Sequence, residues 1–309
     1  MALNLTRRVV VVTGTEGRLR DLLDRDGAPP SAIAEGRVFI DGRRATDENV
    51  TVLPGSEVVV ETARPKVGGA RVLDEWRGLY AAFKPAGIST EPDRRGDASL
   101  VAAIATELGV ARAELHAVTR LDLPVSGIAV LARGANARQL AASLKDEGRL
   151  RRRYVALAKG RALAESGTWD DAVAAQARGQ SAPPRAAMTR YRVAAATSGP
   201  DGNTTSLFVL EPATGRTHQL RIHAAGAGAP LLGDRTYGGA LRVTDRDGRV
   251  LTATRVALHA AKVEVGSADR PEWSVTADVP ADLRALWDHV GGDAGAFETA
   301  SAAPWLYRA

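Results

Sequence analysis

The chain has 309 residues, no cysteine and a net charge of +5, from 41 Lys and Arg against 36 Asp and Glu. The length suggests one large domain or two unequal ones. The lack of cysteine excludes disulfides, thiolate metal sites and thiol nucleophiles, and it fits a reducing compartment. No stretch has the apolar length of a membrane span, so we expect a cytoplasmic protein with no membrane partner. The small positive charge permits a polyanionic partner without requiring one.

The N-terminal block, residues 1–62, has the pattern of a small module. Short helices are predicted over Arg18–Asp24 and Ala32–Glu35, because leucines recur at helical spacing in the first and Gly36 ends the second. Strands are predicted over Arg37–Asp41 and Glu57–Glu61. A module of this size is near the lower limit for folding alone.

Residues 63–75 are the predicted linker, since they carry a proline, two adjacent glycines and scattered charge. The second domain is assigned to residues 76–309. Many strands with few helices, not in strict alternation, predict an α+β fold on a mixed or antiparallel sheet. The predicted helices are Leu100–Leu108 and Ala135–Glu147, and the predicted strands are Leu79–Phe83, Gly127–Ala132, Tyr154–Ala158, Met188–Val193, Ser206–Leu210 and Lys262–Val265.

The segment from Val9 to Leu19 resembles the start of a dinucleotide-binding unit, with a strand, a glycine turn and a helix. Only Gly14 and Gly17 are present, so the three-glycine fingerprint is incomplete. The prolines after the first helix interrupt any long crossover helix. An oxidoreductase that binds a nucleotide cofactor is therefore a minor alternative, and a cofactor titration is expected to show no binding.

Two polar segments lie at the ends of predicted strands, where a site is more expected than a core. Lys84–Gly87 follows the strand that ends at Phe83, and by itself it is best interpreted as a tight turn. Thr119–Gly127 leads into an apolar strand and contains Asp122. That aspartate is either a turn residue that bonds the local backbone or a carboxylate held as nucleophile or base.

The segment Ala213–His223 is too polar to be explained by packing. If Thr217 caps a helix that ends near Gly226, His218 and Arg221 share one face. A strand is also compatible with the periodicity, and both readings stay open. A metal site is not expected, because the two histidines have no acidic partner at ligand spacing. Arginines on such a face favour an anion, either a phosphate or a carboxylate.

Two further segments have a plain interpretation and a functional one. Gly233–Gly239 is compatible with a surface loop. The basic run Arg149–Arg153 is usually a solvated face, but next to Tyr154 it also fits a surface that binds a nucleic-acid backbone and stacks on bases.

Taken in order, these segments resemble the RluA-type pseudouridine synthases, which isomerise uridine in structured RNA. The resemblance covers roughly residues 76–285, and the order of the motifs makes it specific. The matching motifs are KPAG at 84–87, RLD with SG at 120–127, RRRYVALAKG at 151–160, TGRTHQLRIH at 214–223, GDRTYGG at 233–239 and LHA at 258–260.

The resemblance implies a role for each matching residue. Asp122 corresponds to the essential aspartate, which attacks C1′ of the ribose or abstracts a proton at C2′. Arg221 corresponds to its arginine partner, Tyr154 to the tyrosine that stacks on the uracil, and Arg120 to the residue that fills the space of the flipped base. The resemblance implies no metal and no cofactor, an RNA substrate of ribosomal or transfer type, and a monomer. Further substrate contacts are assigned to Lys84, Arg152, Arg216 and His218.

This sequence departs from the family pattern close to Asp122. Thr119 stands where the family usually has histidine, and Leu123, Pro124 and Val125 replace a charged pair and a threonine. These departures motivate the alternative of a catalytically inactive protein that only binds RNA. Retention of the three presumed reacting groups favours an enzyme.

The stretch from Ser31 to Gly42 is similar to the small RNA-binding module first recognised in ribosomal small-subunit protein four. Residues 18–62 carry six Arg and nine Asp plus Glu, a sum of −3, which leaves +8 for the rest of the chain. The second domain is therefore expected to carry most of the phosphate contacts.

Overall fold

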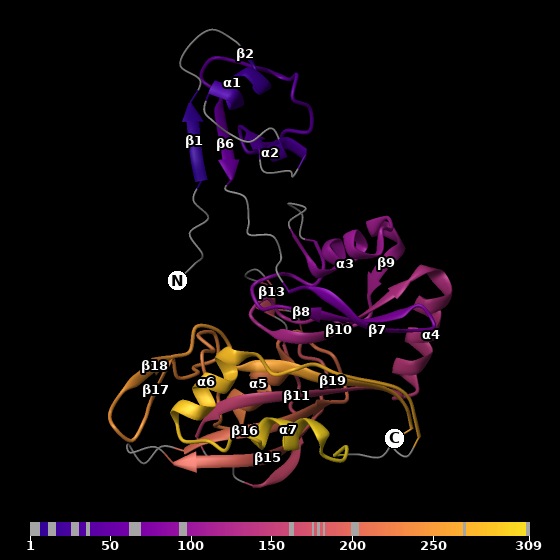
Figure 1. Cartoon of the computed structure of the whole chain (residues 1–309), viewed down its shortest axis with the longest axis vertical. Helices are drawn as coiled ribbons and strands as arrows, with labels where there is room; N and C mark the ends of the chain where they lie inside the picture. The colour runs from indigo at the N-terminus through magenta and orange to yellow at the C-terminus, as the bar shows by residue number, and fades with distance from the viewer. Residues whose placement is uncertain are drawn as a thin grey trace. The chain divides into compact units, whose positions relative to one another are not determined.

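The computed structural model describes residues 7–11, 17–25, 31–34, 38–61, 69–92, 98–160, 164–174, 176–177, 180–181, 183–198, 204–267 and 270–306. The chain divides into two compact units (Figure 1), residues 1–68 with 92–98 and residues 69–91 with 99–309. The predicted linker lies partly outside the described residues, since these stop at 61 and resume at 69.

The smaller unit contains a four-stranded antiparallel sheet in the order β1-β6-β3-β4. Leu19, Leu23, Val38 and Val58 belong to its core, which explains the leucine spacing seen in the sequence. Its elements are β1 (Arg7–Val11), β2 (Gly17–Arg18), α1 (Leu19–Arg25), α2 (Ser31–Ala34), β3 (Val38–Ile40), β4 (Arg43–Arg44), β5 (Thr51–Val52) and β6 (Glu57–Glu61).

The position of β1 contradicts the dinucleotide-binding alternative. That motif needs a parallel strand followed by a crossover helix, whereas β1 pairs antiparallel with β6 over five residues. The turn that contains Gly14 lies outside the described residues. A nucleotide-binding unit at Val9–Leu19 was therefore the wrong interpretation.

The larger unit is built on a ten-stranded sheet. Eight strands follow the order β12-β15-β16-β11-β19-β10-β8-β7, with β20 beside β19 and β9 beside β10. All pairs are antiparallel except β10 with β19, so the predicted mixed, largely antiparallel sheet is confirmed. These strands are β7 (Arg71–Trp76), β8 (Leu79–Lys84), β9 (Leu115–Ala117), β10 (Ser126–Arg133), β11 (Leu150–Lys159), β12 (Ser166–Trp169), β15 (Thr189–Ser198), β16 (Thr204–Pro212), β19 (Leu258–Ser267) and β20 (Arg270–Thr276).

Helices pack on both faces of this sheet. The predicted helix at 100–108 is confirmed, with Ser99 accepting a hydrogen bond from the Ala102 amide and Gly109 ending it at φ 65°. The helix bounds are α3 (Leu100–Leu108), η1 (Arg112–Glu114), α4 (Gly134–Asp146), α5 (Gln219–Gly226), α6 (Ala281–His289) and α7 (Ala296–Ala302). Two small hairpins complete the unit, β13 (Gln176–Ala177) with β14 (Gln180–Ser181) and β17 (Arg242–Thr244) with β18 (Val250–Thr252).

Strand β11 divides its side chains between two cores because successive residues point to opposite faces. Val155 and Leu157 pack with α6 and α7, whereas Tyr154 and Ala156 pack with α3 and α5. The strand begins at Leu150, earlier than the predicted Tyr154, so the basic run lies inside it except for Arg149.

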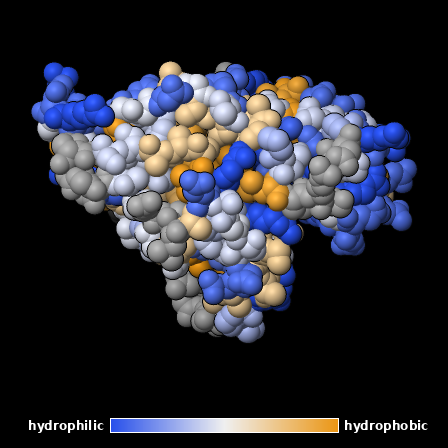
Figure 2. Space-filling view, turned by 90° about the horizontal axis from the view of Figure 1, so that it is seen from below, coloured by the Kyte–Doolittle hydropathy of each residue, from blue (hydrophilic) through white to orange (hydrophobic). Residues whose placement is uncertain are grey.

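The visible surface mixes apolar and hydrophilic residues, with apolar residues in small groups (Figure 2). The exposed large apolar side chains among the described residues are Val50, Leu53, Leu123, Met188 and Val250. Within the same residues, no helix is both long and apolar enough to cross a membrane.

Candidate active site

Asp122 lies in the loop that connects β9 to β10, and neighbouring backbone contacts hold that loop on both sides. The Thr90 hydroxyl donates to the Leu121 carbonyl and accepts from the Leu121 amide, both at 3.0 Å. On the other side, the Gly87 amide donates to the Leu123 carbonyl at 2.8 Å. The carboxylate between these anchors is 23 % exposed, so it is fixed in place but open to a substrate.

Lys84, the last residue of β8, is fully buried below the same loop. Its ammonium donates to the carbonyls of Pro85 at 3.1 Å, Ile88 at 2.9 Å and Leu123 at 3.4 Å. Burial lowers the pKa of Lys84 to about 7, an effect that the charge of Asp122 partly offsets. Lys84 thus holds the loop in position through these three hydrogen bonds. Its role in binding substrate stays a prediction.

Residues Gln219–Gly226 form the helix α5, so of the two interpretations left open the helix is correct. Arg221 projects from this helix toward Asp122. Its Nε and Nη2 donate to the two carboxylate oxygens of Asp234 at 2.7 and 2.8 Å, and its Nη1 lies 3.3 Å from Oδ2 of Asp122. Burial by itself lowers the pKa of Arg221, but Asp234 and then Asp122 outweigh it and raise this pKa above its usual value. The guanidinium therefore stays charged beside Asp122.

The loop at 233–239 is only partly a surface loop. Arg235 is exposed, but Asp234 is fully buried and accepts from the Thr236 and Tyr237 amides at 3.1 and 3.2 Å. A Cβ on Gly239 would lie 1.8 Å from the Leu231 carbonyl oxygen, so only glycine fits this close approach. The glycines fold the loop tightly enough to bring Asp234 to Arg221.

His218 and Tyr237 form a second polar pair beside Asp122. The Nδ1 atom of His218 lies 2.9 Å from the Tyr237 hydroxyl, and its Nε2 lies 3.9 Å from Oδ2 of Asp122. The ring of Tyr237 lies 5.0 Å below the guanidinium of Arg221. His218 and Arg221 therefore both reach Asp122 from the start of α5. The predicted Thr217 cap was wrong, because His218 itself occupies the N-cap position and α5 begins at Gln219.

Tyr154 and Arg152 share one face of β11. Tyr154 is 5 % exposed, and burial raises the pKa of its phenol, an effect that Asp122 adds to and Arg152 opposes. Arg152 donates to the Thr214 carbonyl at 3.0 Å. The phenol therefore stays protonated near Asp122, and the guanidinium links β11 to the loop before α5.

Arg120 and Arg216 lie outside this cluster and are exposed. Arg120 makes one long ion pair with Glu91 at 3.6 Å, and its side chain is 67 % exposed. Arg216 donates to the Ala186 carbonyl at 3.2 Å. Both guanidinium groups can reach a partner in solvent.

The SG and LHA motifs join two neighbouring strands. The Ser126 hydroxyl bonds Nδ1 of His259 at 2.9 Å, and burial lowers the pKa of His259 to about 4. A Cβ on Gly127, which has a φ of 114°, would lie 2.2 Å from the Ala260 carbonyl oxygen. These residues allow the close parallel pairing of β10 with β19 and hold the end of the Asp122 loop.

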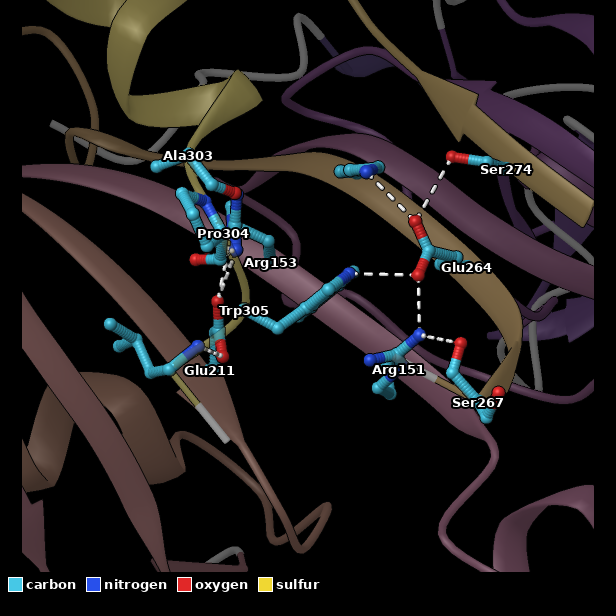
Figure 3. Close-up of polar contacts among 11 residues, drawn as sticks. Arg151, Arg153, Glu211, Glu264, Ser267, Ser274, Ala303, Pro304 and Trp305 are labelled. Atoms are coloured by element: carbon cyan, nitrogen blue, oxygen red, sulfur yellow. Dashed lines mark hydrogen bonds and ion pairs between the residues drawn. The ribbon is translucent and has the colours of Figure 1, made fainter. Parts of the chain in front are cut away.

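The basic run at 149–153 is neither a solvated face nor an open nucleic-acid surface. Arg151 and Arg153 are fully buried and pair with Glu264 and Glu211 (Figure 3). The ring of Trp305 lies against both guanidinium groups, at 4.8 and 4.5 Å. This part of the run binds the C-terminal segment of the chain itself, and only Arg152 turns toward the site.

Sequence reasoning missed the individual roles of Asp234, Tyr237 and Gln219. The amide of Gln219 bonds Thr214, Arg216, Met188 and Thr189 and so fixes the loop before α5. The clustering of polar residues between glycines at 233–239 was the available signal. No three acidic or histidine side chains of the described residues gather as they would to hold a metal ion.

The chain is similar to a known family and to named proteins. Residues 79–226 match the RNA pseudouridylate synthase family. A Bacillus subtilis protein named as an uncharacterized RNA pseudouridine synthase, YhcT, is 30 % identical over 257 residues, 77 % of this chain and 80 % of that protein.

Two relatives carry names that specify an RNA. The ribosomal large subunit pseudouridine synthase D of Xanthomonas campestris is 32 % identical, over 82 % of this chain and 81 % of its own. The tRNA pseudouridine synthase C of Salmonella typhi is 30 % identical over 62 % of this chain and 77 % of its own. The structure of human RNA pseudouridylate synthase domain containing 4 shares the fold, with a TM-score of 0.55 at 20 % identity over 71 % of this chain and 92 % of that one. The chain therefore belongs to the RNA pseudouridine synthase family, whose members are isomerases.

Proposed function

We propose that this protein isomerises specific uridines to pseudouridine in ribosomal or transfer RNA, with Asp122 as the essential carboxylate. The observation that carries the proposal is the position of Asp122, a partly exposed carboxylate 3.3 Å from an arginine whose other edge is occupied by Asp234. The names of two relatives, one for the large ribosomal subunit and one for transfer RNA, support these two substrate classes.

The chemistry needs an ionised carboxylate at the ribose of the target uridine. Attack on C1′ uses that carboxylate as a nucleophile, and proton abstraction at C2′ uses it as a base. Either step breaks the N-glycosidic bond, after which the uracil turns and rejoins through C5. Arg221 supports both, because a charged guanidinium 3.3 Å away favours the ionised form of Asp122.

The proposed partners of the base are Tyr154 and Arg120. Tyr154 has a protonated hydroxyl and a nearly buried ring on the face of β11 next to Asp122, and the uracil is proposed to stack on this ring. Arg120, exposed two residues before Asp122, is proposed to fill the gap left in the RNA when the uridine flips out. Arg216 and Arg152 are proposed to contact phosphates, because arginines pair well with them.

The residues that depart from the family pattern do not loosen the Asp122 loop. Thr119 accepts a hydrogen bond from the Val130 amide at 2.9 Å, and Arg255 donates to the Pro124 carbonyl at 3.3 Å. Leu123 is 54 % exposed while its carbonyl is held from below. An anchored carboxylate favours catalysis over the alternative of an inactive RNA-binding protein.

The smaller unit is proposed to be an RNA-binding module like that of ribosomal small-subunit protein four, and the cytoplasm is the proposed location of the protein. Because residues 18–62 sum to −3, this module is expected to contribute less to phosphate binding than the larger unit does. Deleting residues 1–62 and measuring RNA affinity against salt concentration tests this: a large loss of the salt dependence would contradict it.

The function is tested by mapping pseudouridine in cellular RNA by carbodiimide labelling and primer extension. RNA from cells without the gene is compared with RNA from cells complemented by the wild-type chain. We expect at least one ribosomal or transfer RNA site to vanish without the gene and to return with it. An unchanged map would contradict the proposal.

A further inference from the structure

His218 stands next to Asp122 in the left-handed backbone conformation, which few non-glycine residues adopt. Its φ is 56°, and only Asp41 and Arg77 share a positive φ among the described non-glycine residues. Such strain persists where the surrounding structure enforces it, and it concentrates at functional sites. The strained backbone places the imidazole with Nε2 toward Asp122 and Nδ1 away from it.

Tyr237 holds the far side of this imidazole. Its hydroxyl lies 2.9 Å from Nδ1, its ring meets the imidazole edge-on at 5.8 Å, and its amide donates to Asp234. The same ring lies 5.0 Å from the guanidinium of Arg221. Tyr237 therefore contacts both His218 and Arg221, the two side chains that flank Asp122.

The direction of the hydrogen bond between His218 and Tyr237 follows from the position of Asp122 on the Nε2 side of the imidazole. Burial raises the pKa of Tyr237, so its hydroxyl keeps its proton and can donate to Nδ1. A neutral imidazole that accepts at Nδ1 carries its own proton on Nε2. The opposite tautomer would aim a lone pair at the carboxylate of Asp122, which electrostatics disfavours.

The Nε2–H group is then directed at the space beside the carboxylate. Its distance of 3.9 Å from Oδ2 of Asp122 is too long for a hydrogen bond, and the described part of the chain gives it no other acceptor. A nucleotide whose ribose lies against Asp122 brings an oxygen into this space. The N–H group is thus placed to donate to the reacting nucleotide.

We propose that Tyr237 is a positioning residue that acts through His218, by fixing the imidazole so that its Nε2–H donates to an oxygen of the target nucleotide beside Asp122. The proposal rests on the proposed function and adds Tyr237 to it as the residue that orients His218, a predicted substrate contact. Tyr237→Phe is the informative change, because it removes the hydroxyl and keeps the ring against Arg221.

The test is a double-mutant cycle of Tyr237→Phe and His218→Ala, measured in the full-length chain on an RNA that contains the mapped uridine. We expect each single change to lower kcat about tenfold with little change in KM, and the double variant to match His218→Ala. Tyr80→Phe on β8 is the matched control, because its hydroxyl interacts with Arg133 outside the site. Losses that multiply in the double variant, or a Tyr237→Phe variant as active as the control, would overturn the proposal.

His218→Gln and a spectroscopic measurement separate positioning from folding. Glutamine keeps an N–H donor without tautomers, so Tyr237→Phe is expected to lose its effect in this background. In ¹⁵N-histidine spectra, we expect the Nε2–H form of His218 to dominate in the wild type and to lose population in Tyr237→Phe. The same population of the Nε2–H form in the wild type and in Tyr237→Phe would contradict the proposal. An active Asp122→Asn variant would instead contradict the proposed function.

Discussion

Two buried arginine–carboxylate clusters in the larger unit differ in how the hydrogen-bond donors of the arginine are used. Arg153 donates to Glu211 at 2.9 and 2.6 Å and fills its remaining donors with the carbonyls of Ser301, Ala303 and Pro304. Both of these Arg153 donors share Oε1 of Glu211, whereas Arg221 gives one donor to each carboxylate oxygen of Asp234 and keeps Nη1 for Asp122.

The difference separates a structural ion pair from a candidate site. The two carboxylates that pair most closely with these arginines, Glu211 and Asp234, are fully buried, yet only the second cluster includes a carboxylate that solvent reaches. The C-terminal segment closes the first cluster by covering it with Trp305. A buried arginine is thus a poor sign of function by itself, and a donor left over beside an exposed acid is a better one.

Breaking the closed cluster should have the largest effect on stability. Arg153→Met leaves Glu211 buried without its partner, and burial already raises the pKa of Glu211 against the opposing effect of Arg153. We expect a loss of about 3–5 kcal/mol in the free energy of unfolding, measured by denaturant titration. The double variant Arg153→Met with Glu211→Leu should recover much of it. A single variant as stable as the wild type would show that the cluster is not a structural one.

Changing the open cluster should affect activity more than stability. Arg221→Lys keeps the charge but loses the planar fork that binds Asp234 and Asp122 together. We expect kcat to fall by at least about a hundredfold while the protein stays folded. Circular dichroism melts and single-turnover assays on the mapped RNA measure both. Equal losses of Tm in Arg221→Lys and Arg153→Met, with activity retained in the first, would remove the distinction between the clusters.

Lys84, under the open cluster, should make stability depend on pH. Its folded pKa of about 7 is far below that of an unfolded lysine, so between these values the unfolded chain binds more protons. The unfolding free energy should therefore rise above about pH 7 toward pH 10, with a slope of up to about 1.4 kcal/mol per pH unit. Lys84→Met should lack this contribution. Parallel curves of unfolding free energy against pH for the wild type and Lys84→Met would show that Lys84 does not titrate in this range.

The smallest effect is expected at Arg120, which takes part in neither cluster. Arg120→Ala should leave Tm unchanged because its pair with Glu91 is exposed and long. We expect kcat to fall a few-fold with an unchanged slope of log affinity against log salt, because the proposed role of Arg120 is at the flipped base. A slope smaller in size by about one would contradict this role and indicate a contact with a phosphate.

The sequence was sufficient for the mixed, largely antiparallel sheet and for the helix at 100–108, because alternation and capping are local signals. It was insufficient for the burial of Arg151 and Arg153, since the sequence of a basic run is the same whether the run is exposed to solvent or pairs with buried glutamates from β16 and β19. Glu211 and Glu264 are 58 and 113 residues from their arginines, a separation at which local patterns carry no information.

The candidate site shows the same limit. Motif order pointed to Asp122 and Arg221, and the structure places them 3.3 Å apart. Nothing local indicated that Asp234 holds the arginine from the other side, or that Tyr237 bonds His218, because a tight glycine loop brings these residues in. The roles of the eight residues predicted to react or bind substrate stay predictions.

The central claim, that Asp122 carries the chemistry beside the open arginine, is tested most directly with Asp122→Asn. The purified variant and the wild-type chain are compared for pseudouridine formation and for RNA affinity on the RNA whose modification depends on the gene. We expect no detectable product from the variant, with RNA affinity within about threefold of wild type, since the substitution keeps the shape of the side chain. Product formation at a rate near that of the wild type would contradict it.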